Sequence, residues 1–163
     1  MNLYLLRHGD AAPGHPDDTR PLTEKGEEDI RKLTSILKKK KAVRVDRVCV
    51  SPLLRAQQTA DLFLDGLGIE AQREIDPGLI PEANPARTAR EALEAQLDLL
   101  LIGHNPHLEL LASYLLTGRS NGAMMVISTG SLLCLENTHI RPDIGACMLR
   151  WMISPKVLKS TPA

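Results

Sequence analysis

Three pairs of polar residues in this chain have the side chains needed to hold a phosphate group, and each pair begins directly after a short apolar run. The pairs are Arg7 with His8, Ser51 with Arg55, and His104 with Asn105. Guanidinium groups such as those of Arg7 and Arg55 match phosphate oxygens with paired, charge-assisted hydrogen bonds. Two guanidinium and two imidazole groups in one place would surround an anion. These residues therefore indicate a phosphate-binding site.

The apolar runs before these pairs predict three buried strands, over residues 2–6, 45–50 and 97–102. In an open α/β sheet, ligand sites form beyond the carboxyl ends of the strands, so the polar residues that follow the strands should meet there. Continuous apolar strands that alternate with helices predict a mainly parallel sheet covered by helices on both faces. The sequence therefore predicts an α/β protein with one site at the edge of its sheet.

The rest of the pattern predicts four helices, a short edge strand and a terminal hairpin. Thr23 is the expected N-cap of the first helix, which runs to the lysines at 38–41. The second helix is expected to open at Ser51-Pro52 and to aim free backbone N–H groups toward the region of Arg55. The other expected helices span residues 84–96 and 106–116, and the other expected strands span 70–75, 131–136 and 146–153.

Length and charge narrow the classes of function. At 163 residues the chain fits one domain spanning 1–163, and its 43% apolar and 25% charged residues are close to the globular average. Twenty basic and twenty acidic residues cancel, so the broad positive field that nonspecific binding to nucleic acid or membrane requires is absent. The opening apolar run is too short for a signal sequence, and no window approaches the roughly 18 apolar residues of a membrane span. We therefore expect a cytoplasmic protein with no nucleic-acid or membrane partner.

The cysteines and the other possible metal ligands give no sign of a metal site. Cys49, Cys134 and Cys147 are far apart, odd in number and set in apolar runs, which predicts buried free thiols. Neither a zinc-ligand spacing nor another constellation of metal ligands occurs. We expect no metal and no cofactor.

Four motifs, in this order along nearly the whole chain, resemble those of the histidine phosphatase (phosphoglycerate-mutase-like) superfamily, and most of all its small SixA-type phosphohistidine phosphatases. The motifs are Leu-Arg-His-Gly-Asp at 6–10, Arg-Pro-Leu-Thr-x-x-Gly at 20–26, Ser-Pro-Leu-x-Arg-Ala-x-Gln-Thr at 51–59 and Gly-His-Asn-Pro at 103–106. Arg-His-Gly alone is a weak signal, but four motifs at these spacings are specific. The resemblance implies a three-layer α/β/α sandwich.

The resemblance also implies roles for individual residues. His8 would accept the phosphoryl group, and Arg7, Arg55 and His104 would form the phosphate pocket. Asp10 matches an acidic position of the SixA-type branch and would have an auxiliary role in substrate binding. In such a mechanism, an unprotonated nitrogen of His8 attacks phosphorus while Arg7, Arg55 and a protonated His104 hold the phosphate oxygens. Ser51 and Asn105, at the same strand ends, are further candidates for substrate binding.

Two departures from the family pattern bear on the substrate. Gly14 stands where many relatives carry an asparagine, and Glu82 lies one residue out of register with the glutamate that mutases and general phosphatases use as a proton donor. Expelling an alkoxide from a phosphomonoester requires a proton, whereas imidazole is a far less basic leaving group. A phosphatase without the usual acid is therefore suited to phosphohistidine.

Taken together, the residues and the resemblance predict a metal-independent phosphohistidine phosphatase that acts through a covalent phosphohistidine intermediate. Only 48 residues separate Arg55 from His104, which leaves little chain for a lid and suits a protein substrate, such as a component of a His-to-Asp phosphorelay. One alternative is a broad phosphomonoesterase that uses Glu82 or Asp10 as its acid. Another is an inactive phosphate-binding module, although both histidines of an active site are present.

Overall fold

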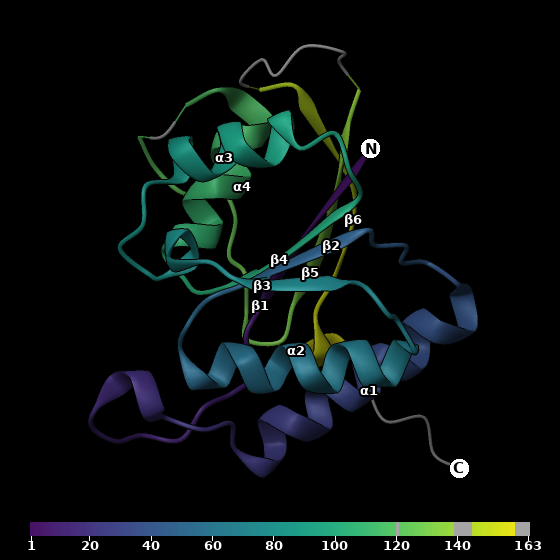
Figure 1. Cartoon of the computed structure of the whole chain (residues 1–163), viewed down its shortest axis with the longest axis vertical. Coiled ribbons are helices and arrows are strands. Elements are labelled where there is room, and N and C mark those ends of the chain that lie inside the picture. Colours follow the sequence, from purple (N-terminus) through teal and green to yellow (C-terminus); the bar gives the residue numbers. More distant parts are fainter. Residues whose placement is uncertain (120, 139–144, 159–163) are drawn as a thin grey trace.

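A six-stranded sheet runs through the computed structural model, which describes residues 1–119, 121–138 and 145–158 (Figure 1). The strand order is β3-β2-β4-β1-β5-β6. Pairing is parallel from β3 to β1, and β5 lies antiparallel to both β1 and β6. The predicted, mainly parallel sheet is confirmed. The strands are β1 (Asn2–Arg7), β2 (Arg47–Val50), β3 (Gln72–Ile75), β4 (Leu99–Gly103), β5 (Leu132–Asn137) and β6 (Cys147–Ile153).

Two pairs of helices cover the two faces of the sheet, so that the layers are α/β/α (Figure 1). Neighbouring residues of β1 enter different cores, because successive side chains of a strand point to opposite faces. Leu3 and Leu5 pack with α3 and α4, while Tyr4 and Leu6 pack with α1 and α2. Burial on both faces explains why β1 and β4 are continuously apolar. The helices are α1 (Glu24–Lys40), α2 (Leu54–Leu67), α3 (Pro85–Glu94) and α4 (His107–Thr117).

The helix starts follow the predictions with one correction. Thr23 is the N-cap of α1, and its hydroxyl oxygen accepts a hydrogen bond of 3.0 Å from the backbone N–H of Gly26. The second helix does not open at Ser51-Pro52 but at Leu54. The backbone of Ser51 still bonds to β4, since its N–H donates to the carbonyl of Ile102 at 3.0 Å. Pro52 also disfavours helical backbone angles for the residue before it.

The terminal hairpin and the cysteines also agree with the sequence. β5 and β6 pair as predicted, while residues 139–144 of the loop expected between them lie outside the described residues. All three cysteines are free and buried. No helix among the described residues has the length and apolar character needed to cross a membrane.

The segment after His8 passes so close to the first turn of α1 that only glycine fits between them. A Cβ atom added to Gly26 would lie 2.2 Å from the carbonyl oxygen of Asp10. A Cβ atom added to Gly9 would in turn lie 3.0 Å from the carbonyl oxygen of Gly26. The helix start thus sets the path of the chain directly after His8.

We expect Gly26→Ala to destabilise the protein by about 1–3 kcal/mol, because the added methyl group forces two backbone segments apart. Urea unfolding measures this change. Gly122→Ala is the matched control, because a Cβ atom there would meet open space. Equal stability of the two variants would contradict the close approach of Gly26 to Asp10.

Candidate active site

The three predicted pairs do converge, because the backbone ties together the ends of three neighbouring strands. The N–H of His8 donates to the carbonyl of Gly103 at 3.1 Å, and the N–H of Ser51 donates to the carbonyl of Ile102 at 3.0 Å. The ring centroids of His8 and His104 are 4.7 Å apart, and the two ring planes are tilted by 48°. Strands β1, β2 and β4 therefore deliver their terminal polar residues to one pocket.

His8 is oriented and kept neutral by its surroundings. Its Nδ1 lies 2.6 Å from the carbonyl oxygen of Gly9, which can only accept, so Nδ1 carries the proton. Nε2 then bears a lone pair and has no hydrogen-bond partner among the described residues. Burial, together with the charges of Arg55 and Arg7, lowers the pKa of His8 to about 4. At neutral pH the Nε2 atom of His8 is an unprotonated nucleophile facing a basic pocket.

His104 is also neutral among these neighbours, whereas the protonated His104 of the predicted mechanism belongs to the step in which it holds phosphate oxygens. The ring is 1% exposed, and its Nε2 lies 2.8 Å from the hydroxyl oxygen of Ser51. Burial lowers the pKa of His104 to about 3, and the neighbouring His8 and Arg55 add to the shift. Its Nδ1 is buried and has no partner among the described residues. When Ser51 donates to Nε2, the proton of His104 sits on Nδ1.

Each of the two arginines is held by a backbone carbonyl. Nη1 of Arg7 donates to the carbonyl of Ile127 at 2.6 Å, while its Nε is buried without a partner among the described residues. Arg55 is 5% exposed, and its Nη1 donates to the carbonyl of Asp17 at 2.7 Å. Both guanidinium groups therefore have fixed positions beside the imidazoles.

Asp17 is a part of the site that the sequence did not reveal. It lies in the short 3₁₀ turn η1 (Asp17–Thr19), and its carboxylate accepts from Nη2 of Arg55 at 3.0 Å and from Nη1 of Arg20 at 2.8 Å. Hydrogen bonds from these two arginines hold the pKa of Asp17 below its usual value. Asp17 and Arg55 are 38 residues apart, and no motif spacing connects them.

Two predicted binding residues form hydrogen bonds with neighbouring segments. The carboxylate of Asp10 accepts a hydrogen bond of 2.9 Å from the hydroxyl of Thr23, at the start of α1. The amide nitrogen of Asn105 donates to Glu109 at 2.6 Å and to the carbonyl of Ile127 at 2.9 Å. Ser51 contributes through its hydrogen bond to His104.

Glu109, in the first turn of α4, is a second residue that the sequence did not single out. Its carboxylate accepts from Asn105 and also from the backbone N–H of Ile127 at 2.9 Å. Because the carbonyl of Ile127 accepts from Arg7, the carboxylate of Glu109 fixes the segment on which Arg7 rests. Glu109 is a positioning residue for Arg7.

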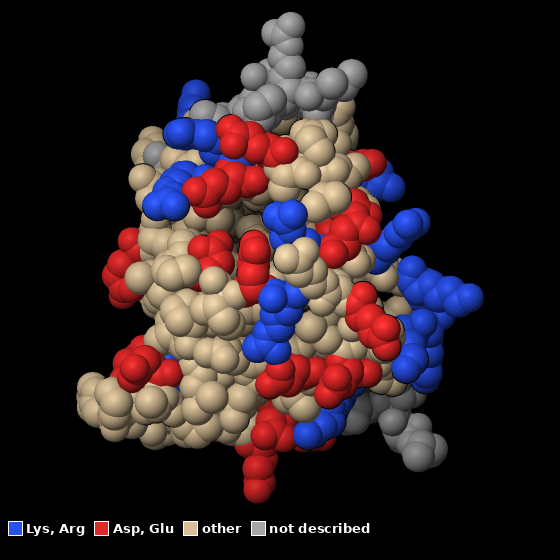
Figure 2. Space-filling view, in the orientation of Figure 1, with Lys and Arg blue, Asp and Glu red and all other residues tan. Residues whose placement is uncertain are grey.

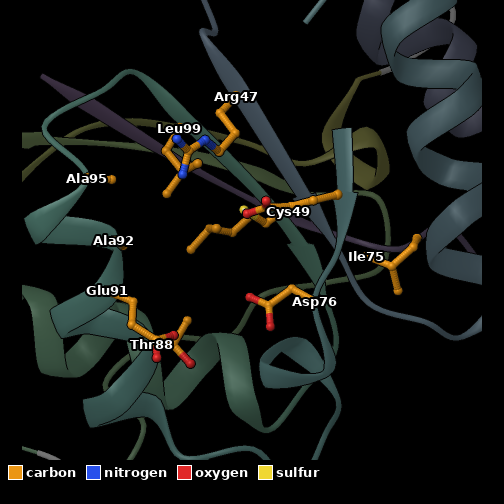
Figure 3. Close-up of a pocket in the computed structure, with 11 residues that line it drawn as sticks. Arg47, Cys49, Ile75, Asp76, Thr88, Glu91, Ala92, Ala95 and Leu99 are labelled. Carbon is orange, nitrogen blue, oxygen red and sulfur yellow. The ribbon is translucent and has the colours of Figure 1, made fainter. Parts of the chain in front are cut away.

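A second hollow of about 310 Å³ lies between α3 and the strands β2, β3 and β4 (Figure 3). The thiol of Cys49 donates there to the carboxylate of Glu74 at 3.0 Å, and burial raises the pKa of that thiol, so it is no thiolate nucleophile. Arg47 and Asp76 also line the hollow, but neither the paired histidines nor Arg7 and Arg55 reach it. No group of ligating side chains among the described residues could hold a metal ion.

Comparisons with known proteins agree with the motifs. A model of the histidine phosphatase superfamily (branch 1) matches residues 3–81. The phosphohistidine phosphatase SixA of Escherichia coli (strain K12) is 32% identical over 168 residues, which cover 100% of this chain and 99% of that protein. The structure of the protein histidine phosphatase SixA complexed with tungstate has a TM-score of 0.84 and 29% identity, and covers 98% of this chain and 100% of that one.

A more distant structure shares the fold. The alpha-ribazole phosphatase of Shigella flexneri has a TM-score of 0.73 at 21% identity, with 95% of this chain and 97% of that chain covered. The predicted fold class and the resemblance drawn from the motifs are both confirmed.

The lowered pKa of His8 can be tested by NMR. We expect a ring resonance that titrates with a midpoint near pH 4, whereas an unperturbed histidine titrates near pH 6.5. The shift is downward because burial and the arginine charges both disfavour the imidazolium. The resonance is assigned by its loss in His8→Gln. A midpoint at or above 6.5 would contradict the basic, buried pocket.

We expect Glu109→Ala to lower kcat/KM by about tenfold or more, since it leaves the backbone N–H of Ile127 and the amide of Asn105 without their acceptor and releases the segment that holds Arg7. Steady-state kinetics and affinity for orthovanadate measure the loss. Glu109→Gln keeps an acceptor oxygen and should recover part of the rate. A variant with normal vanadate affinity would show that Arg7 does not depend on Glu109.

Proposed function

The chain belongs to the histidine phosphatase superfamily, and from this premise we propose that it removes the phosphoryl group from phosphohistidine in a protein substrate. The observation that carries the proposal is the free Nε2 of a neutral His8, beside the ring of His104 and under the positive charge of Arg55 and Arg7. Similarity to a phosphohistidine phosphatase over the full length of the chain supports the same substrate class.

In the proposed first step, Nε2 of His8 attacks phosphorus in line with the leaving nitrogen of the substrate. A bond forms from Nε2 to phosphorus, and the bond from phosphorus to the substrate imidazole breaks. The substrate ring leaves as neutral imidazole, because its other nitrogen already carries a proton. Arg7 and Arg55 stabilise the charge on the phosphoryl oxygens, and Nε of Arg7 and Nδ1 of His104 are buried polar atoms that lack a partner among the described residues. A bound dianion would raise the pKa of His104, because an opposite charge favours the imidazolium.

In the second step, water attacks the phosphorus on His8 and releases inorganic phosphate. No metal is needed to balance the charge, because the fixed cations of Arg7 and Arg55 already face the phosphoryl group. The free Nε2 of His8 is restored, and the enzyme is ready for another turnover.

The surroundings of the candidate acids favour a nitrogen leaving group. The carboxylate of Asp10 is occupied by the hydroxyl of Thr23, and Glu82 is exposed and forms no hydrogen bond with another described residue. Asp17 is closer to the pocket, but two arginines hold it ionised. An alkoxide leaves only with a proton, whereas an imidazole leaves without a strong acid.

Two alternative functions make different predictions from this proposal. A broad phosphomonoesterase would need Glu82 or Asp10 to reach the leaving oxygen, and an inactive phosphate-binding module would need no nucleophile. We further propose that the substrate is a phosphohistidine-containing protein such as a component of a phosphorelay. A cytoplasmic location stays a prediction.

The test compares phosphate release from a phosphohistidine peptide and from a phosphoserine peptide of otherwise identical sequence. We expect kcat/KM to be at least a hundredfold higher for phosphohistidine, because general acid catalysis contributes about 10²–10⁴-fold and is missing here. His8→Ala should lower the rate by at least about a thousandfold. The intermediate is sought by a quench in alkali, in which phosphohistidine is stable, followed by detection of phosphate on the protein.

Controls and contrary outcomes are specific to each reading. His15→Ala removes an exposed loop histidine and should leave the rate unchanged. Comparable rates on the two peptides would favour the phosphomonoesterase, and Glu82→Gln and Asp10→Asn would then identify its acid. An unaffected His8→Ala enzyme would overturn the mechanism. Every assay contains EDTA, so loss of the rate there and its restoration by a divalent ion would contradict the metal-independent mechanism.

A further inference from the structure

A cleft of about 370 Å³ opens beside the phosphate pocket, between the loop that carries η1 and the segment that follows the short turn η2 (Pro77–Leu79). We propose that this cleft binds the residues next to the phosphohistidine of a protein substrate, and that it selects lysine and arginine there. The proposal rests on the proposed function. We call it the acidic cleft, because its rim carries Asp17, Asp18 and Glu82 and its floor is formed by Leu53, Ile80 and Pro81.

The acidic cleft adjoins Arg55 through Asp17. Asp17 lines the cleft and at the same time contacts the guanidinium group of Arg55 through its carboxylate and its carbonyl oxygen. Leu53 of the floor immediately precedes the first residue of α2, the helix that carries Arg55 in its first turn. This cleft is therefore within reach of the residues next to a phosphoryl group that binds at Arg55.

The charges on the rim are available to a partner. Asp18 and Glu82 are both exposed, and neither forms a hydrogen bond or an ion pair with another described residue. Asp17, by contrast, is bonded to two arginines. Figure 2 shows acidic atoms at the left of the view over η1 and over the segment after η2, with uncharged atoms between them. The chain as a whole has a formal net charge of zero, so this negative rim is a local feature.

An apolar floor between carboxylates is suited to a particular kind of side chain. Lysine and arginine lay their methylene stems on apolar surface and keep the charged end at a polar rim. The floor of leucine, isoleucine and proline would take such a stem, and Asp18 and Glu82 would take the charge. An acidic side chain would instead meet like charge, which disfavours binding and gives the cleft its selectivity.

The experiment uses two phosphohistidine peptides that differ only in the residues beside the phosphohistidine, which are lysines in one and glutamates in the other. We expect the wild-type enzyme to show a kcat/KM at least about fivefold higher for the lysine peptide, as expected for a few exposed charge pairs. Asp18→Lys should reduce the preference, and the double variant Asp18→Lys with Glu82→Lys should abolish or invert it. The preference should also shrink as salt is added, because the pairs are exposed to solvent.

The matched control is Glu70→Lys, which makes the same charge change at an exposed site just before β3, at the opposite end of the sheet strands. It should keep the wild-type preference. Asp18→Lys should also hydrolyse the small phosphoramidate ion at the wild-type rate, since that substrate does not reach the cleft. Thermal unfolding checks that each variant is folded.

The outcomes separate this inference from the proposed function. If the wild-type enzyme hydrolyses both peptides equally well and the rim variants change nothing, the docking surface is wrong although phosphohistidine hydrolysis stands. If Glu70→Lys abolishes the preference as strongly as Asp18→Lys, the effect belongs to net charge and the cleft assignment is overturned. If neither phosphohistidine peptide is hydrolysed while a phosphomonoester is, the proposed function fails, and the inference fails with it.

Discussion

Repulsion among basic groups in a buried pocket is the constraint on which the site depends. His8 and His104 lie 4.7 Å apart beside two guanidinium groups, in a place where little water screens their charges. Arginine stays charged at any ordinary pH, so only the imidazoles can relieve the repulsion by remaining neutral. Burial is the largest cause of the lowered pKa values of both histidines, and this repulsion adds to it. A neutral imidazole has a free lone pair, so the same electrostatics leave Nε2 of His8 unprotonated, as the proposed attack on phosphorus requires.

The sheet, and the edge of the sheet at which the site lies, could be predicted because both depend on patterns that are visible in the sequence. Strands buried on both faces must be continuously apolar, so the runs that became β1 and β4 were recognisable without a structure. Parallel strands end at the same edge, and this places Arg7 and His8 beside Ser51 and His104 wherever helices separate the strands. Ser51 lies between a predicted strand and a predicted helix. Its backbone N–H bonds to β4, and the helix begins only at Leu54.

What the sequence could not supply were the contacts that hold the reactive groups in place. Asp17 bonds to Arg55 from a loop that has no regular pattern, and Glu109 acts on Arg7 only through the backbone of Ile127. The lowered pKa of His104 could not be predicted for the same reason, since its burial and its distance from His8 exist only in the folded chain. The chemistry of a side chain follows from its residue type. Its neighbours, and hence its pKa, are known only from the folded structure.

Asp17 connects the choice of leaving group with the choice of protein partner. Its carboxylate balances two arginines at the edge of the pocket, and the same hydrogen bonds that hold it there keep it ionised. An ionised carboxylate has no proton to donate, so Asp17 cannot serve as the general acid for a substrate whose leaving group needs a proton. Next to Asp17, the exposed carboxylates of Asp18 and Glu82 line the same cleft, where they would attract a basic segment. The charged state of these carboxylates has two consequences: the site has no acid to donate a proton, and the rim favours cations. Both consequences suit a phosphorylated imidazole among basic residues.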